Sequence, residues 1–249
     1  MTTAVGEHPV VLITGAARRI GASIARALHA AGYDLALHCR DSRAELDALI
    51  VELEALRPLS TLVLQADLAD AERLPELVTA TLARFGRLDG LVNNASAFHA
   101  TPLGTITPAQ WDELFAANAR APLFLSQAAA PHLAARRGAI VNLVDIYAER
   151  PLTGHSVYCM AKAALVMATR ALAVELGPRV RVNAIAPGNI LWSTNAIKAE
   201  TQVTVEHRTT LGRQGSPQEI AAAVLFLLRD ASYCSGAILP VDGGRLLYI

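Results

Sequence analysis

The stretch VVLITGAARRIG, residues 10–21, decides the fold of this chain. A short apolar run at 10–14, typical of a strand covered on both faces, leads through Gly15 directly into a helical pattern. A glycine at such a junction lets the backbone turn tightly and approach a phosphate. The helix N-terminus then offers free N–H groups and the positive end of its dipole. A tight turn without a ligand stays the alternative interpretation of the glycines alone.

Short apolar runs alternate with longer amphipathic segments along the whole chain. The predicted strands are 10–14, 35–38, 61–65, 90–94, 139–144, 180–186 and 237–241. The predicted helices are 21–31, 43–56, 71–85, 108–136, 157–177 and 217–229. Because strand alternates with helix and no linker or repeat interrupts the pattern, we expect one α/β domain over 1–249, a doubly wound parallel sheet with helices on both faces. Ligands of such sheets bind at the carboxyl ends of the strands.

The composition narrows the class of protein. The 249 residues carry 22 Lys+Arg against 22 Asp+Glu and are 53% apolar, so neither intrinsic disorder nor a nucleic-acid partner is expected. No apolar run approaches the ~20 residues of a membrane-spanning helix, and the first residues lack the order of a signal peptide. Cys39, Cys159 and Cys234 are widely spaced. We therefore expect a cytoplasmic protein with free thiols and no metal site or membrane partner.

Arginines near the first two strands indicate which nucleotide binds. Arg40 follows the second predicted strand, where an acidic residue would hold the ribose of NAD and an arginine accommodates the extra phosphate of NADP. Arg18 and Arg19 lie at the helix mouth, a poor place for cations unless an anion binds there. These arginines predict NADPH or NADP+, whereas Asp41 is the signal that would favour NAD. A solvated loop charge is the alternative interpretation of Arg40.

Tyr158 and Lys162 are four residues apart, which places them on one face of a predicted helix. A phenol is a poor proton donor at neutral pH, and a neighbouring ammonium favours phenolate and lowers the phenol pKa. Tyr158 could then act as general acid toward a substrate that is being reduced. The chain has five tyrosines and only two lysines, which argues against a chance pairing. Lys198, the second lysine, has no such partner and is predicted to be a surface residue.

Together these motifs resemble the short-chain dehydrogenase/reductases. The resemblance rests on 14–21, 93–95, Asn118, Tyr158 with Lys162, and 187–188, and it runs from about residue 10 to residue 244. It implies a Rossmann fold with seven parallel strands, an NAD(P)(H) cofactor and a homotetramer. It also implies that Tyr158 is the proton donor, that Lys162 holds the nicotinamide ribose and that Asn118 supports a water-mediated proton relay.

Two departures from the superfamily pattern resemble the pteridine reductases, a branch that includes bacterial dihydromonapterin reductases. Arg19 replaces the middle glycine of TGxxxGxG, and Asp145 replaces the serine that precedes Tyr158 by thirteen residues. A serine hydroxyl suits a ketone, because it can donate to a carbonyl oxygen. A pterin offers C=N bonds and a 2-amino edge, so Asp145 could accept from that edge or pass a proton through Tyr158. An inert loop acid is the alternative interpretation of Asp145.

Three further stretches are similar to the same branch: 37–38 with Ser42, 94–98, and 187–192. Phe98 lies where a ring could stack on a flat pterin with nicotinamide on the other face, and 193–214 is expected to form a lid. The alternative for Phe98 and Trp192 is a loop residue that covers the core.

The predicted cofactor-binding residues are Gly15, Arg18, Arg19, Ile20, Gly21, His38, Arg40, Ser42, Asp67, Leu68, Asn94, Ala95, Ser96, Val144, Tyr158, Lys162, Pro187, Gly188 and Ile190. The predicted substrate-binding residues are Ser96, Phe98, Asp145, Tyr158, Leu191 and Trp192, and the catalytic ones are Asp145, Tyr158, Lys162 and Asn118.

The sequence therefore predicts an NADPH-dependent reductase of dihydropteridines. Its substrates would be of the dihydromonapterin or dihydrobiopterin type, with dihydrofolate a weaker one, and its products tetrahydropterins. Hydride would pass to C6, with protonation at N5 assisted by Asp145, Tyr158 and Lys162. Two alternatives stay open. Asp145 in place of serine argues against a general carbonyl or 3-oxoacyl-thioester reductase, and a non-catalytic nucleotide-sensing protein would not need the Tyr158/Lys162 pair.

Overall fold

A seven-stranded parallel sheet forms the centre of the protein. The computed structural model describes residues 7–190 and 207–248. The strands are β1 (Val10–Ile13), β2 (Asp34–Cys39), β3 (Thr61–Gln65), β4 (Gly90–Asn93), β5 (Ala139–Leu143), β6 (Arg181–Pro187) and β7 (Ile238–Val241). They pair in the order β3-β2-β1-β4-β5-β6-β7, and every pairing is parallel. The order changes direction between β1 and β4, which confirms the predicted doubly wound α/β fold and places its switch point there.

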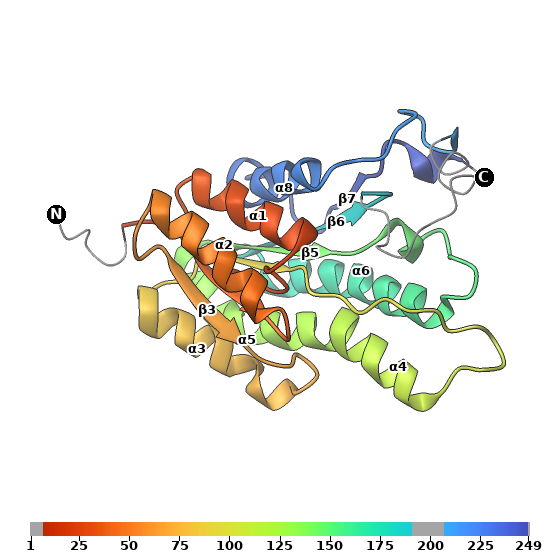
Figure 1. Ribbon diagram of the computed structural model, residues 1–249, viewed down its shortest axis with the longest axis horizontal. Helices are drawn as coiled ribbons and strands as arrows, with labels where there is room; N and C mark the ends of the chain where they lie inside the picture. The colour runs from red at the N-terminus through yellow and green to blue at the C-terminus, as the bar shows by residue number, and fades with distance from the viewer. Residues whose placement is uncertain (1–6, 191–206, 249) are drawn as a thin grey trace.

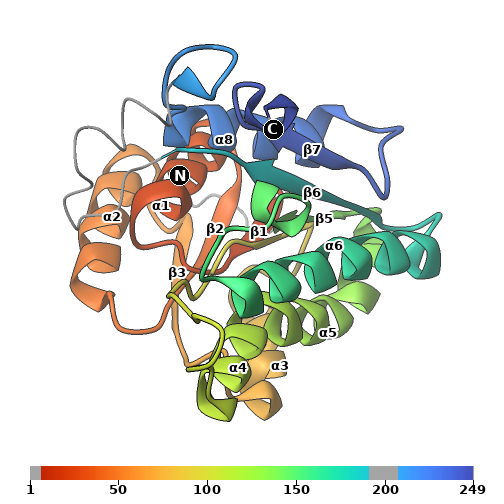
Figure 2. The same ribbon diagram turned by 90° about the vertical axis from the view of Figure 1, so that its right-hand side faces the viewer.

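Helices cover both faces of this sheet (Figures 1 and 2). One face carries α1 (Arg19–Ala30), α2 (Arg43–Leu56) and α8 (Pro217–Leu225), and the other carries α3 (Leu74–Phe85), α5 (Ala121–Arg136) and α6 (Ser156–Leu176). The helix α4 (Pro108–Phe115) precedes α5 and lies at the right of Figure 1 with the loop that follows β4. Because both faces are covered, β1, β4 and β5 are buried along their whole length, which explains their largely apolar sequence.

The helix predicted over 108–136 is confirmed in its bounds, but it is not regular along its whole length. It begins at a capping box, in which the Thr107 hydroxyl accepts the N–H of Gln110 and Pro108 takes the first helical position. A π-helical turn, η2 (Ala116–Arg120), then separates α4 from α5. Such turns insert one extra residue and are frequent at functional sites. The turn brings Asn118 into the wall of the site described below.

Other element ends differ from the predictions by a few residues. The predicted helix 217–229 also closes in a π-helical turn, η4 (Phe226–Asp230), and the one predicted over 71–85 opens in a 3-10 turn, η1 (Ala71–Arg73). The helix α1 begins at Arg19, two residues earlier than predicted. Helix ends fray and often tighten into a 3-10 turn, so a local sequence pattern defines them only to within a few residues.

The helix α6 is the one helix among the described residues that is long and apolar enough to cross a membrane. Half of its most apolar window is buried inside the fold, where Leu165 packs with Ala184 of β6 and Leu172 lies in the core that α5 also covers. Core packing therefore accounts for its apolar character. Its N-terminal turns carry Tyr158 and Lys162 to the end of β5.

Candidate active site

The turn between β1 and α1 closes around Gly15 and Gly21. Gly15 has φ +64°, and a Cβ on it would lie 2.9 Å from the Cα of Ala95. A Cβ on Gly21 would lie 2.1 Å from the carbonyl oxygen of Gly15, so neither position accepts a side chain. The first turn of α1 contains no acidic residue. This backbone cradle at a helix N-terminus fits the pyrophosphate of a dinucleotide.

Asn94 and Thr14 hold this turn against the end of β4. The side-chain amide of Asn94 donates to the carbonyl oxygens of Thr14 and Gly15, each at 2.9 Å. The Thr14 hydroxyl oxygen accepts the N–H groups of Asn94 and Ala95, each at 3.0 Å. The predicted cofactor residue Asn94 therefore has its amide engaged in shaping the turn.

His38 supports the turn from below. It is buried, and its Nδ1 accepts the N–H of Gly15 at 3.3 Å while its Nε2 lies 3.1 Å from the carbonyl oxygen of Ala66. Burial lowers the pKa of its imidazole, which favours the neutral form that these two contacts require. Both ring nitrogens are occupied, so this predicted cofactor residue positions the turn and offers no free nitrogen to a ligand.

Three arginines follow β1 and β2. Arg18 pairs with Glu45 of α2 at 3.3 Å, and Arg40 pairs with its neighbour Asp41 at 2.7 Å. Both pairs are exposed, so either arginine can exchange its carboxylate for a phosphate at small cost. Arg19 has φ +54°, the left-handed conformation that glycine adopts most readily, at the place where the superfamily pattern has glycine.

The remaining predicted cofactor residues lie after strand ends. Asp67 is exposed after β3 and accepts the N–H of Ala69 at 2.9 Å, and Ser42 precedes α2. Gly188 follows β6, where a Cβ would lie 2.7 Å from the Cα of Asp242. The predicted residues with apolar side chains, namely Ile20, Leu68, Val144, Pro187 and Ile190, are half-buried or buried. Leu191, Trp192 and most of the predicted lid, 193–206, lie outside the described residues.

Asp145, Tyr158 and Lys162 meet where β5 ends and α6 begins. The Tyr158 hydroxyl donates to Oδ2 of Asp145 at 2.7 Å, and Oδ1 of Asp145 accepts the N–H of Tyr147 at 2.9 Å. The Lys162 ammonium donates to the carbonyl oxygen of Leu143 at 2.9 Å and lies 5.7 Å from the centre of the Tyr158 ring. The structure thus brings three of the four predicted catalytic side chains together in one buried corner.

Burial has the largest effect on the pKa of each of these groups. It raises the pKa of Asp145, against the lowering by the Tyr147 N–H, the Tyr158 hydroxyl and the Lys162 ammonium. Burial, and then the Asp145 carboxylate, raise the pKa of Tyr158 well above its ordinary value. Burial lowers the pKa of Lys162 to about 8, and the Asp145 carboxylate opposes that shift.

Burial and the Asp145 carboxylate raise the pKa of Tyr158, so the predicted lowering by Lys162 does not set the direction of the shift here. The ammonium is directed at the backbone carbonyl of Leu143, while the Asp145 carboxylate is in direct contact with the phenol. A negative neighbour and a buried environment both disfavour phenolate. Tyr158 keeps its proton more firmly than a free tyrosine does.

Asn118 is fully buried in the π-helical turn η2. Its amide donates to the carbonyl oxygens of Leu114 and Ala97, each at 2.9 Å, and its Oδ1 accepts the Ser96 hydroxyl at 2.7 Å. A hydrogen bond with Ser96 also acts on Tyr158, where it lowers the pKa against the larger effect of burial. Ser96 thus stands between Asn118 and the proposed acid, an arrangement compatible with a proton relay.

Phe98 and His155 extend the site beyond the acid. The Phe98 ring contacts the Tyr158 ring edge to face, with centres 4.8 Å apart and planes at 85°. It also stacks on the His155 imidazole at 4.8 Å and 12°. Sequence reasoning missed His155. The available signal was its position three residues before Tyr158, which is about one helical turn.

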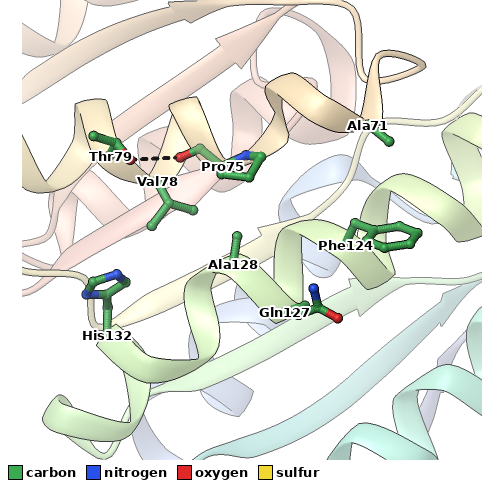
Figure 3. Close-up of a pocket in the computed structure, with 8 residues that line it drawn as sticks. All are labelled: Ala71, Pro75, Val78, Thr79, Phe124, Gln127, Ala128 and His132. Atoms are coloured by element: carbon green, nitrogen blue, oxygen red, sulfur yellow. Dashed lines mark hydrogen bonds between the residues drawn. The ribbon is translucent and has the colours of Figure 1, made fainter.

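A surface pocket between α3 and α5 is separate from this site (Figure 3). Its volume is about 270 Å³. The lining residues are Ala71, Pro75, Val78, Thr79, Phe124, Gln127, Ala128 and His132. His132 is the one titratable side chain among them, so this pocket offers no acid–base pair comparable to the group at the end of β5.

Comparison with known proteins agrees with the fold. The family described as enoyl-(acyl carrier protein) reductase matches residues 15–245. The chain is 37% identical to pteridine reductase 1 of Leishmania tarentolae, with 96% of each chain covered, and 38% identical to human L-xylulose reductase, with 94% of this chain and 95% of the relative covered. It is 33% identical to a 3-oxoacyl-[acyl-carrier-protein] reductase of Staphylococcus aureus, with 95% and 97% covered. The protein belongs to the short-chain dehydrogenase/reductase superfamily and is an oxidoreductase of the kind that uses a nicotinamide cofactor.

Proposed function

We propose that this protein is an NADPH-dependent reductase of dihydropteridines. The observation that carries the proposal is the Asp145 carboxylate, 2.7 Å from the Tyr158 hydroxyl, at the position where the superfamily pattern has serine. A carboxylate accepts hydrogen bonds from the amino edge of a pterin, which a carbonyl substrate lacks. The identity with pteridine reductase 1 supports the proposal, while the L-xylulose and 3-oxoacyl reductases among the relatives represent the carbonyl alternative.

The residues of the cradle suit NADPH. Gly15 and Gly21 leave room for the pyrophosphate at the start of α1. Arg19 and Arg40 would bind the phosphate that distinguishes NADPH from NADH, with Arg40 leaving Asp41 to do so. When bound, this cofactor supplies the hydride that passes to C6 of a 7,8-dihydropterin.

The buried corner at the end of β5 supplies the proton. Tyr158 holds a proton on its hydroxyl oxygen, because burial and Asp145 raise its pKa, and it can deliver that proton toward N5 of the ring. Once Tyr158 has given up its proton, Asp145, whose own pKa is raised by burial, is placed to take a proton from solvent and pass it to the phenolate across the same 2.7 Å contact. Lys162 carries the positive charge that stabilises a developing phenolate and would hold a ribose hydroxyl.

A substrate screen tests this function. The loss of NADPH or NADH is followed with dihydromonapterin, dihydrobiopterin and dihydrofolate, and in parallel with a β-keto thioester and L-xylulose. We expect the highest kcat/KM for a dihydropterin with NADPH. Good turnover of the thioester or the sugar with none of either dihydropterin would contradict the proposal and favour a carbonyl reductase. NADPH binding without turnover of any substrate would favour a nucleotide sensor.

We also propose a homotetramer in the cytoplasm. Met160, Met167 and Val174 are exposed and seven residues apart, so they form an apolar stripe along one face of α6. Such a stripe suits burial against another copy of the chain. Light scattering of the purified protein should give four chains per particle, and a monomer at micromolar concentration would contradict this. The free thiols agree with a reducing compartment.

A further inference from the structure

Three rings from two distant segments meet beside the acid. Phe98 belongs to the loop after β4, whereas His155 and Tyr158 begin α6. The Phe98 ring is nearly parallel to the imidazole of His155 and nearly perpendicular to the ring of Tyr158. Even so, Phe98 is 56% exposed. One face of Phe98 is thus covered by His155, and ring surface remains open to a ligand.

Backbone contacts hold the loop after β4 against the start of α6. The N–H of Thr101 donates to the carbonyl oxygen of Gly154 at 2.6 Å, and Thr101 forms an isolated parallel bridge with His155. Thr101 is fully buried, so this tie is sheltered from water. The loop that carries Phe98 is therefore fixed to the residue that its ring stacks upon.

The orientation of the His155 ring is also fixed. Its Nδ1 lies 3.0 Å from the carbonyl oxygen of Thr153. A carbonyl oxygen only accepts, so Nδ1 carries the proton and donates. The carbonyl oxygen of Thr153 thereby orients the imidazole without a contribution from Phe98.

We propose that His155 is a positioning residue that fixes the plane of Phe98, so that the open face of Phe98 stacks on the flat ring of the substrate. This inference rests on the proposed reduction of dihydropteridines. An exposed phenylalanine on a loop has several rotamers, and a ligand that stacks on it must immobilise one of them. The stack on His155 fixes one rotamer of Phe98 before the substrate binds. It acts through Phe98 and needs no contact with the substrate.

The consequence is selectivity for flat, conjugated substrates. Loss of the stack should weaken binding of a dihydropterin, which relies on Phe98. It should leave binding of NADP+ unchanged, because the nucleotide cradle at Gly15 and Gly21 lies on other segments. A residue that only supported the start of α6 would instead change thermal stability and affect every ligand alike.

The experiment compares four variants with the wild type: His155→Ala, His155→Asn, His155→Phe and, as a control distant from the site, His132→Ala. Calorimetry measures the dissociation constant of dihydrobiopterin on the NADP+-loaded enzyme, and steady-state kinetics gives its KM. For Ala and Asn we expect both constants to rise about three- to tenfold, the size of one aromatic pair. His155→Phe keeps a ring and should stay within about twofold of the wild type. NADP+ affinity and the melting temperature should be unchanged in all four.

Each outcome decides the matter. If Ala and Asn bind dihydrobiopterin as the wild type does, the inference is overturned while the proposed function stands. If His155→Phe loses affinity for dihydrobiopterin as His155→Ala does, the imidazole acts through its hydrogen bonds. The stacking role is then overturned. If the wild type binds no dihydropterin, both the inference and the proposed function fail. If His155→Ala does not fold, the affinities of His155→Asn and His155→Phe for dihydrobiopterin decide between the two roles.

Discussion

Replacement of Lys162 by methionine tests the electrostatics of the site. The lysine is 2% exposed, and burial lowers its pKa from 10.5 to about 8. The difference corresponds to about 3 kcal/mol by which the charged side chain reduces the free energy of unfolding at neutral pH. Methionine has a similar length and no charge, so Lys162→Met should remove this cost while abolishing turnover. Loss of the hydrogen bond to Leu143 lowers the free energy of unfolding of the variant by about 1 kcal/mol, which offsets part of this gain.

The pH dependence separates the charge from other effects of the substitution. Below about pH 8 Lys162 is protonated in the folded and the unfolded chain, and the cost is fully present. Between about 8 and 10.5 the unfolded chain keeps a proton that the folded chain has released, so the stability of the wild type rises with pH. Across this window the wild type should gain about 3 kcal/mol relative to the variant.

Urea unfolding at a series of pH values measures this gain. One protein concentration is used throughout, because assembly adds to apparent stability. Lys198→Met, at the lysine that the sequence predicts to lie on the surface, is the control and should show no comparable trend. We expect Lys162→Met to be more stable than the wild type at neutral pH and to lose that advantage as the solution becomes alkaline. A difference that is constant with pH, or that grows with it, would refute a buried ammonium at this position.

Three further substitutions test the acid, the nucleotide specificity and the cradle. Tyr158→Phe should lower kcat about 10²–10⁴-fold and leave NADPH affinity nearly unchanged in a fluorescence titration; surviving turnover would show that Tyr158 is not the acid. Arg40→Ala should weaken NADPH binding about tenfold or more and spare NADH, because it removes a charged partner of the extra phosphate; equal weakening of both would place Arg40 elsewhere. Gly21→Ala should abolish binding of both nucleotides, since its Cβ would lie 2.1 Å from the Gly15 carbonyl oxygen, and retained affinity would refute the cradle.

The order of strands and helices was predictable because each strand has a strong local signal. A parallel strand covered on both faces is apolar at nearly every position, and β1 shows this directly. The division of the predicted helix 108–136 was not predictable, because it depends on contacts distant in the sequence. Asn118 bonds both to Leu114 within the helix and to Ala97 in the loop after β4. No periodicity in the helix itself reports the second contact.

The candidate site divides in the same way. Tyr158 and Lys162 are predictable from spacing alone, because one helix carries both. The contact of Asp145 with Tyr158 depends on how β5 meets α6, and only the family resemblance pointed to it before the structure. The direction of the Tyr158 pKa followed from burial and from that contact, neither of which a spacing of four residues reveals. The stack of His155 on Phe98 likewise depends on the tie between two separate loops.

The pKa values in the buried corner explain how a weak acid can still donate. Burial raises the pKa of Asp145 and lowers that of Lys162, so the two groups come closer in proton affinity than free side chains would be. Burial also raises the pKa of Tyr158, which therefore keeps its proton until an acceptor arrives. In the proposed reduction, the proton transfer would be driven by the basic ring nitrogen of a dihydropterin and by the Lys162 charge, which stabilises phenolate as it forms. The burial that reduces stability at Lys162 is the same burial that holds the proton on Tyr158. Stability and proton transfer therefore place opposite demands on this lysine, and Lys162→Met should improve the first at the expense of the second.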